Sequence, residues 1–365
     1  MADETTDLYI NASGSSAVNL EMTNNSSTGP ESQLDKLIIY PIVPIMFFSN
    51  LGLITNSLNV AVFIKMGLKE TTNISMLSLA VSDFLSCLLG LWTYLCYIPE
   101  FRNIPNLPFE PTEVSSETGS SPRPYVTRTG ALITAFITLE RCLCVVLPMK
   151  VKRIITIPVT RITMIVIYAI TLIPFIAHPL YTTLGWKYYP HLNKTLIGAI
   201  PTNDAIAPTF LLMNNFLVGF IFLLFAIIVI FVCTLFLVIT LAKSLRWRDS
   251  MRKQTQTHGS SGQASSQKFS EPRKENRLIK MVVVIATLFI ICHLPGTILI
   301  FLVPVVDKYL EENFNDPFLI LQVSFIFAFE LVNNSVNFFV YYLIGTKFRF
   351  TFRQMVGLKD KKSTS

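Results

Sequence analysis

Long stretches that are almost free of charge alternate with short polar stretches along the whole chain. Seven of these stretches carry at most three charges each and cover residues 37–64, 71–99, 125–146, 162–186, 205–242, 281–306 and 317–346. A helix that crosses a bilayer needs about 20 apolar residues, and a charge at mid-bilayer is costly. None of the stretches alternates with period two, so a membrane β-barrel is excluded. The pattern therefore predicts seven membrane-spanning helices.

The composition agrees with this interpretation. The 365 residues are 51% hydrophobic and only 15% charged, whereas about a quarter of a soluble domain is charged. A soluble enzyme and a low-complexity disordered chain are both excluded on these grounds. We expect an all-α membrane protein whose spans cover about residues 37–64, 71–98, 122–147, 160–184, 205–242, 276–305 and 317–345.

Basic residues gather on one side of the predicted membrane. Of the 30 lysines and arginines, 23 lie on the side that follows spans one, three, five and seven, with Arg141 at the end of span three among them, and the positive-inside rule makes that side cytoplasmic. The N-terminal tail (1–36) is then extracellular, and the third loop (243–275) and the C-terminal segment (347–365) are cytoplasmic. The net charge of +7 follows from membrane topology, so no nucleic-acid partner is implied. We expect a multi-pass protein of the plasma membrane.

Glycosylation sequons fit the same orientation. Four N-x-S/T triplets fall on the predicted outer side, at Asn11, Asn24, Asn25 and Asn193. We expect these four asparagines to be glycosylated.

A few polar residues lie deep inside the predicted spans. Asp83 is near the middle of span two, and Asn56, Asn333, Asn334 and Asn337 lie at comparable depths in spans one and seven. Polar groups in lipid need partners, which predicts one buried polar cluster. A structural role explains the asparagines almost as well as a switch does, while the carboxyl group of Asp83 favours function.

At this point the sequence resembles the rhodopsin-like family of G-protein-coupled receptors over about residues 37–352. The resemblance rests on motifs that occur in the family's order. They are Thr55-Asn56, Leu79-Ala80-Val81-Ser82-Asp83, Leu139-Glu140-Arg141-Cys142, Phe289 with Cys292-His293-Leu294-Pro295, and Asn337-Phe338-Phe339-Val340-Tyr341. Residues 133–142 look particularly like those of invertebrate chemosensory and neuropeptide receptors. Phe348 and Arg349 would open a short amphipathic eighth helix.

The resemblance implies a mechanism. Arg141 would pair with Glu140 and with Glu275 at rest, and a ligand would favour a state in which span six swings outward and a Gα helix enters the opened groove. The implied activation switch comprises Asn56, Asp83, Phe289, Cys292, His293, Pro295, Asn333, Asn337 and Tyr341. An allosteric sodium ion at Asp83 is also implied, although Gly130 stands where the family often has a serine. Further implied partners are arrestin, a receptor kinase and membrane lipids.

The cysteines depart from the family's pattern. The family usually joins the outer end of span three to the second outer loop by a disulfide, but Ser116 stands near the first position and the loop has no cysteine. We therefore expect this bridge to be missing. Residues 115–124 are rich in Ser, Gly and Pro, so we expect the outer half of span three to be frayed or shifted.

Two charges inside the spans are the candidates for ligand contact. Arg128 in span three and Glu330 in span seven could face one cavity, either as a structural ion pair or as ligand contacts. The ligand could be a peptide drawn to the acidic outer loops or a small chemosensory molecule. A transporter lacks support because no internal repeat is apparent, and an enzyme lacks support because the histidines are scattered. A receptor-like scaffold or decoy without G-protein coupling remains the closest alternative.

Overall fold

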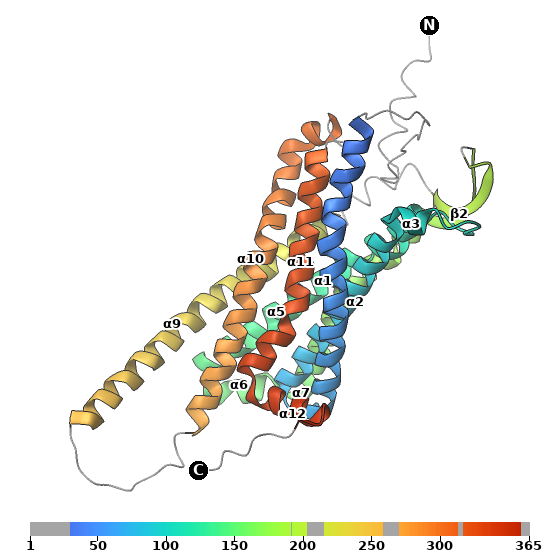
Figure 1. The fold of residues 1–365 in the computed structure, drawn as a ribbon. Coiled ribbons are helices and arrows are strands. Elements are labelled where there is room, and N and C mark those ends of the chain that lie inside the picture. Colours follow the sequence, from blue (N-terminus) through green and yellow to red (C-terminus); the bar gives the residue numbers. More distant parts are fainter. Residues whose placement is uncertain (1–29, 191, 203–214, 258–269, 313–316, 359–365) are drawn as a thin grey trace.

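A computed structural model describes residues 30–190, 192–202, 215–257, 270–312 and 317–358. The chain forms a bundle of seven long helices, with the first described residues of the first helix at one end of the bundle and the short last helix at the opposite end (Figure 1). The long helices are α1 (Pro30–Met66), α2 (Thr71–Tyr97), α5 (Arg123–Val146), α7 (Ile157–Ile176), α9 (Phe222–Thr257), α10 (Ser270–Glu312) and α11 (Pro317–Ile344).

Short elements connect these helices. They are α3 (Pro99–Arg102), α4 (Pro111–Ser115), the π-helix η1 (Ser116–Ser120), α6 (Pro148–Ile154), the 3₁₀ turn η2 (His178–Leu180), strands β1 (Thr182–Tyr189) and β2 (Lys194–Pro201), the π-helix η3 (Asn215–Ile221) and α12 (Thr346–Met355). The two strands form an antiparallel hairpin at one end of the bundle, which we call the hairpin end. Helix α12 lies at the opposite end, which we call the α12 end (Figure 1).

Helix boundaries follow from backbone chemistry. Helix α1 ends before Gly67, which takes a left-handed φ of 86° that favours glycine. Helix α2 ends before Ile98, whose extended backbone is the conformation favoured by a residue preceding a proline. Helices α5 and α7 each begin with a proline in their first turn, where its missing N–H breaks no hydrogen bond.

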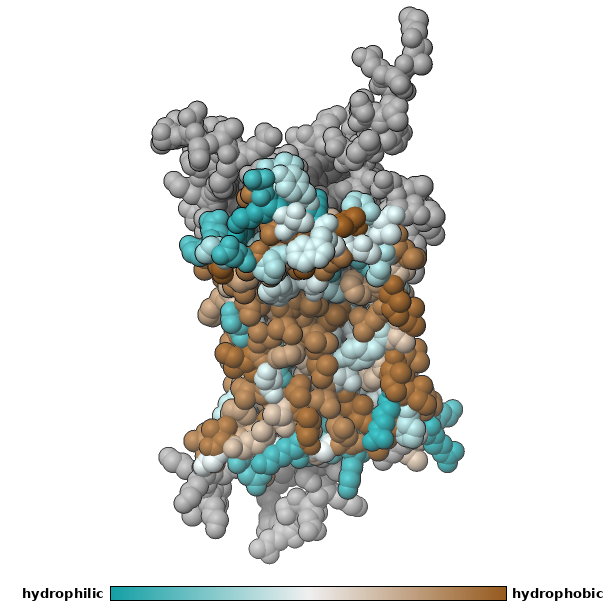
Figure 2. Space-filling model, turned by 90° about the vertical axis from the view of Figure 1, so that its right-hand side faces the viewer, coloured by the Kyte–Doolittle hydropathy of each residue, from teal (hydrophilic) through white to brown (hydrophobic). Residues whose placement is uncertain are grey.

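The helices pack so that α1 contacts α2 and α11, while α5 contacts α2, α7 and α9. Helix α10 closes the bundle against α9 and α11. Six of the described helical segments are long and apolar enough to cross a membrane, and α11 is the seventh helix of the bundle. Figure 2 shows a hydrophobic band around the middle of one face with hydrophilic side chains at both ends. This arrangement is that of a multi-pass membrane protein.

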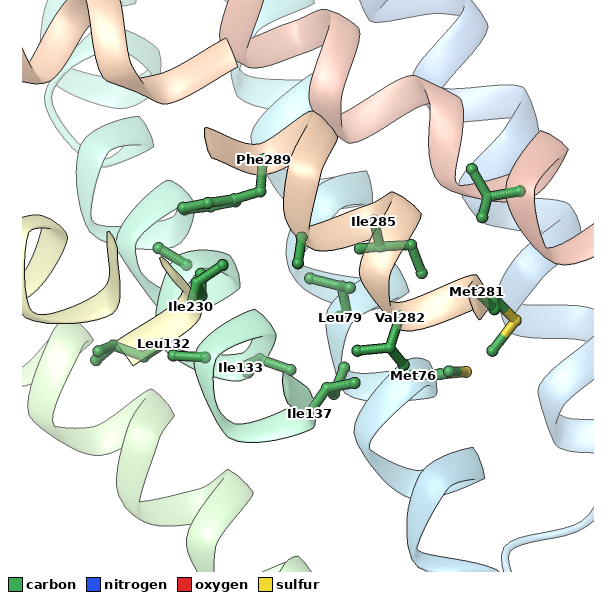
Figure 3. Close-up of a cluster of buried hydrophobic side chains, with 14 of the residues drawn as sticks. Met76, Leu79, Leu132, Ile133, Ile137, Ile230, Met281, Val282, Ile285 and Phe289 are labelled. Carbon is green, nitrogen blue, oxygen red and sulfur yellow. The ribbon is translucent and has the colours of Figure 1, made fainter. Parts of the chain in front are cut away.

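The main apolar core takes buried side chains from all seven long helices and from α12. Met76 and Leu79 of α2, Ile137 of α5, and Val282 and Phe289 of α10 are among its buried members (Figure 3). Close packing of such side chains is what holds helices together when lipid is as apolar as the core. The core thus joins α5 and α10 along the middle of the bundle.

The seven spans were predicted in the right order, but several boundaries were wrong. Residues 182–184 were assigned to span four, yet they belong to β1, because hydrophobicity alone does not separate a short strand from a helix end. Residues 243–257 and 270–275 were assigned to a loop, yet they continue α9 and α10. Charged residues end a membrane span without ending a helix, since Lys, Arg and Gln are good helix formers.

The outer part of span three was expected to be frayed or shifted; it is helical and not frayed, but its hydrogen-bond register is shifted by a π-helical turn. The chain runs from α4 through η1 into α5, and Ser121 N–H donates to Ser116 C=O at 2.8 Å across the wide turn. A π-helical turn shifts the hydrogen-bond ladder by one residue just before Pro122 and Pro124, which have no N–H to give. The indole of Trp92 on α2 donates to the hydroxyl of Thr118 at 2.8 Å and ties this segment to the bundle.

Candidate functional site

A buried ion-pair cluster joins α5 to α11 in the hairpin half of the bundle. Glu330 accepts from Arg123 at 3.0 Å and from Arg128 at 3.3 Å, one carboxylate oxygen for each arginine. All three side chains are buried, and the ring of Phe327 lies 4.6 Å from the Arg123 guanidinium. The structure thus brings the predicted Arg128 and Glu330 together. It adds Arg123, which was not among the predicted ligand contacts because it lies in the segment 115–124 that was expected to be frayed or shifted.

Helix α10 reaches this cluster through His293. Its Nδ1 lies 3.9 Å from Glu330 Oε1, and its ring stacks on Phe289 with 4.1 Å between centroids. Phe289 belongs to the apolar core, so one short path connects the ion pairs to the core. Neighbouring Cys292 is also buried, whereas Pro295 faces outward. Of the predicted switch residues of span six, Phe289, Cys292 and His293 are thus buried in the bundle, and Phe289 and His293 lie between the ion pairs and the core.

Asp83 forms the centre of a second polar layer. Its Oδ2 accepts from Asn337 Nδ2 at 2.8 Å, which joins α2 to α11. Ser86, one turn along α2, accepts from Asn334 at 3.0 Å and lies 3.1 Å from the Thr127 hydroxyl. The predicted buried polar cluster is confirmed in its position, with Ser86 and Thr127 as members that the sequence did not reveal.

Helix α1 joins this layer through its own polar residues. Asn56 donates to the Asn334 carbonyl at 2.8 Å, and Thr55 donates to the Ser335 carbonyl at 3.1 Å. Asn333 is buried beside Asn334, with Nδ2 3.4 Å from its neighbour's Oδ1. These bonds use carbonyls of α11 as acceptors, so they fix the helix backbone and its side chains together.

The surroundings of Asp83 offer some of the oxygen ligands that a sodium ion would need, but not all of them. The carboxylate supplies one anionic oxygen beyond its bond to Asn337, and Ser82 lies beside it against Gly130. Ser82 donates its hydroxyl hydrogen to the Val126 carbonyl, which leaves its oxygen lone pairs free to bind a cation. Gly130 provides no side-chain oxygen. Asp83 would therefore be the single charged ligand of a bound sodium ion.

At the α12 end, Arg141 is held by its neighbour and by α2. Its guanidinium lies 2.6 Å from Glu140 Oε1 and also donates to the hydroxyl of Thr72. Thr71 donates to the same Glu140 oxygen at 2.6 Å. The predicted pairing with Glu140 is confirmed, while the side chain of Glu275 lies outside the described residues. Threonines are common at helix starts, so nothing in the sequence indicated that Thr71 and Thr72 would contact Glu140 and Arg141.

Tyr341 lies on α11 between the Asp83 layer and the α12 end of the bundle. It is fully buried, and its ring packs edge-on against Phe63 of α1 and obliquely against Phe348 of α12. Phe348 is buried at the start of α12, which places this amphipathic helix against α1 and α11 as predicted. Among the described atoms, the Tyr341 hydroxyl has no hydrogen-bond partner. A buried hydroxyl of this kind favours any rearrangement that supplies a partner.

At the hairpin end, one carboxylate ties span three to the hairpin. Glu113 of α4 is buried and accepts from Lys187 at 2.9 Å, from the Tyr189 hydroxyl at 2.8 Å and from the Ala199 N–H at 2.8 Å. The Glu110 N–H adds a bond to the Ile197 carbonyl at 2.8 Å. All six cysteines lie in the described part of the chain, and none of them lies in α4, η1 or the hairpin. Hydrogen bonds to Glu113 therefore join the outer part of span three to the second outer loop, the two segments that a disulfide usually joins in the family.

Gly198 makes this contact possible. A Cβ atom at this position would overlap the Tyr189 hydroxyl and lie 2.6 Å from Glu113 Oε2. Burial raises the pKa of the Tyr189 hydroxyl above its usual range, and its hydrogen bond to Glu113 raises it further. The hydroxyl therefore remains a donor to Glu113 across the physiological pH range.

Of the four predicted glycosylation sites, the structure describes Asn193. It is exposed in the turn between β1 and β2, with a left-handed φ of 50° that asparagine tolerates, and accepts from the Tyr188 hydroxyl at 2.8 Å. Asn11, Asn24 and Asn25 lie outside the described residues. Glycosylation of all four stays a prediction.

A bundle of seven membrane helices with buried polar layers and a Glu-Arg pair at one end defines a class of membrane receptors. The sequence model of the seven-transmembrane receptors of the rhodopsin family matches residues 55–341. The chain therefore belongs to the rhodopsin family of G-protein-coupled receptors, a family of receptors and not of enzymes. Such receptors work in general with a ligand and a G protein. A search of curated proteins found no match to the chain.

Proposed function

We propose that this chain is a plasma-membrane receptor that binds an extracellular ligand near the hairpin end and activates a heterotrimeric G protein at the α12 end. The orientation is supported by the 23 of 30 basic residues on the α12 side. The ligand is a peptide or a small chemosensory molecule, as the resemblance in residues 133–142 suggests. Arrestin, a receptor kinase and membrane lipids are further proposed partners.

The observation that carries this proposal is the restraint on Arg141. One carboxylate and one threonine hydroxyl hold its guanidinium against α2, and the residue is buried. An arginine held by few, breakable contacts can be released when neighbouring helices move. In the proposed active state the inner end of α10 moves outward, Arg141 is freed, and a helix of the Gα subunit docks in the opened groove.

The bundle offers a route from ligand to Arg141. The Glu330 cluster contacts His293, His293 stacks on Phe289, and Phe289 belongs to the core that includes Ile137, four residues before Arg141. A ligand that binds better to the arrangement with α10 displaced would shift the population toward it. Pro295 removes a backbone hydrogen bond of α10 and provides a point about which the helix can bend.

The test is a ligand screen, with peptides and small metabolites together, against cells that carry promiscuous G proteins. We expect a second-messenger response that Arg141→Ala abolishes while surface expression is kept. A response that persists undiminished in Arg141→Ala would contradict the proposed role of Arg141.

A scaffold or decoy without coupling is the second candidate. It is favoured by Phe338, which stands where the family's motif has proline, and by His293 in place of the aromatic residue of span six. Surface-expressed receptor that binds a ligand but never drives nucleotide exchange would support it.

A further inference from the structure

The ion-pair cluster between α5 and α11 carries more positive than negative charge. Two guanidinium groups face one carboxylate, and each arginine gives Glu330 a single hydrogen bond. The Nε atoms of Arg123 and Arg128, and Nδ1 of His293, are buried and make no hydrogen bond to the described residues. Arg123 and Arg128 are each only 4% exposed. The cluster therefore holds unused donors and an unmatched positive charge.

Such an arrangement is costly inside a membrane. An unpaired buried donor loses its hydration without a replacement bond, and an unmatched charge costs more. The carboxylate of Asp83, which belongs to the second polar layer, accepts from Asn337 and not from either arginine of this cluster. An additional anion with two oxygens would match the planar fork of an arginine and satisfy the free Nε edges. A cationic amine would add to the surplus charge instead.

The residues around the cluster indicate the chemistry of the rest of such an anion, beyond its charged group. The ring of Phe327 lies under the Arg123 guanidinium, and Phe289 stacks on His293. On the α2 side, Gly90 has no side chain beside Arg123. Even a Cβ atom at position 90 would lie 3.7 Å from the Nε atom of Arg123. Aromatic faces beside a cationic group favour a small organic acid with an apolar or aromatic body.

We propose that the ligand is a small organic molecule with a carboxylate group, which binds the guanidinium edges of Arg123 and Arg128 in competition with Glu330. This inference rests on the proposed receptor function and names its ligand class. The ligand's carboxylate takes over hydrogen bonds that tie α5 to α11 in the resting arrangement. Glu330 then turns from the arginines, and the contact with His293 on α10 changes with it.

The first experiment replaces the internal carboxylate with a free one. Purified full-length Glu330→Ala receptor leaves both arginines without their partner, and acetate can occupy the vacated place. We expect acetate to raise the Tm of Glu330→Ala by about 2–4 °C over chloride at equal ionic strength. Acetamide, which has the same shape without the charge, gives no rise, and the double variant Arg128→Gln/Glu330→Ala gives none with acetate. An equal effect of acetate and acetamide, or an undiminished effect in the double variant, overturns the proposal.

The second experiment uses the unaltered receptor and does not depend on the folding of any variant. Benzoate and benzamide form a matched pair, as do phenylacetate and phenylacetamide. We expect the carboxylate of each pair to raise the Tm of the wild-type receptor more than the amide does. Equal shifts within both pairs overturn the proposal.

These readouts separate the ligand class from the receptor function. Thermal stabilisation by carboxylates needs no G protein. It therefore supports the ligand class even if nucleotide exchange is never observed. Conversely, a response to a ligand without any acidic group that Arg141→Ala abolishes and Arg128→Gln leaves unchanged overturns the ligand class and supports the receptor function.

Discussion

Single residues inside the bundle work in pairs from different helices. Asp83 is hydrogen-bonded to Asn337, and Glu330 is hydrogen-bonded to Arg123 and Arg128. Each partner comes from a distant part of the chain. In the low dielectric of a membrane interior, losing one member leaves the other uncompensated, which costs about 3–5 kcal/mol for a buried ion pair. Arg141 differs, because its carboxylate partner Glu140 is the preceding residue of the same helix and its own bond to α2 goes to a single hydroxyl, that of Thr72.

Removing the hydroxyl that holds Arg141 should loosen the resting state. Thr72→Val keeps the side-chain shape but cannot accept from the guanidinium, a loss of about 1 kcal/mol or about fivefold in population. We expect basal nucleotide exchange on G protein to rise about fivefold in this variant. Thr72→Ser keeps the hydroxyl and serves as the matched control. Equal basal rates in the two variants would show that this hydrogen bond does not restrain Arg141.

Asp83 is also the residue at which sodium binding can be tested. We propose that sodium stabilises the resting receptor through the Asp83 carboxylate, the single charged ligand in this layer. The Tm of the purified receptor should be higher in sodium chloride than in choline chloride at equal ionic strength. Asp83→Asn keeps the shape and should remove the difference. A sodium effect of the same size in Asp83→Asn places the ion elsewhere.

Among the elements, helices in the membrane were predictable and their ends were not. The length of an apolar stretch predicts a membrane-spanning helix, because the backbone must be hydrogen-bonded inside the lipid. It does not predict the structure of the residues that lie outside the lipid. Helices α9 and α10 therefore run past the predicted loop boundaries, and β1 replaces the end of span four. The continuation of span three past Pro122 depends on a π-helical turn, which no periodicity reveals.

The candidate site was predictable in part for a related reason. Charges such as Asp83, Arg128 and Glu330 stand out in apolar stretches, so their importance could be inferred from the sequence. Their partners could not, because ordinary residues such as Thr72 and Ser86 become significant only when two helices bring them together. Arg123 was not predicted to contact Glu330, because its segment of span three was expected to be frayed or shifted.

The hairpin depends on Glu113 where a disulfide is missing. Glu113→Gln keeps the size but loses the charge that pairs with Lys187, and it supplies one strong acceptor oxygen in place of two. We expect amide hydrogen exchange in β1 and β2, and at Ala199 above all, to become about tenfold faster, equivalent to about 1.4 kcal/mol.

The exposed Glu100 of α3 provides the comparison. Glu100→Gln removes one carboxylate charge from the same end of the bundle without touching the hairpin. Should both variants exchange at the wild-type rate in the hairpin, Glu113 does not hold it in place.

At the scale of the whole molecule, the bundle links two charged regions at opposite ends of an apolar core. The Glu330 cluster lies in the hairpin half, Arg141 lies at the α12 end, and α5 and α10 pass between them. Membership in the rhodopsin family makes this link meaningful, because such receptors couple a ligand to a G protein across the membrane. The central claim is that Arg141, once released, permits coupling.

Nucleotide exchange on purified G protein tests this claim most directly, and it needs no ligand. Glu140→Gln keeps the side-chain shape but weakens the hold on Arg141, since a hydrogen bond to a charged group is worth about 1.5–3 kcal/mol. We expect Glu140→Gln receptor in lipid nanodiscs to exchange at least tenfold faster than wild type. The double variant Glu140→Gln/Arg141→Ala should fall to the rate of G protein alone. A Glu140→Gln rate no higher than that of G protein alone, across all G-protein classes, would contradict the account and favour a receptor-like protein that does not couple.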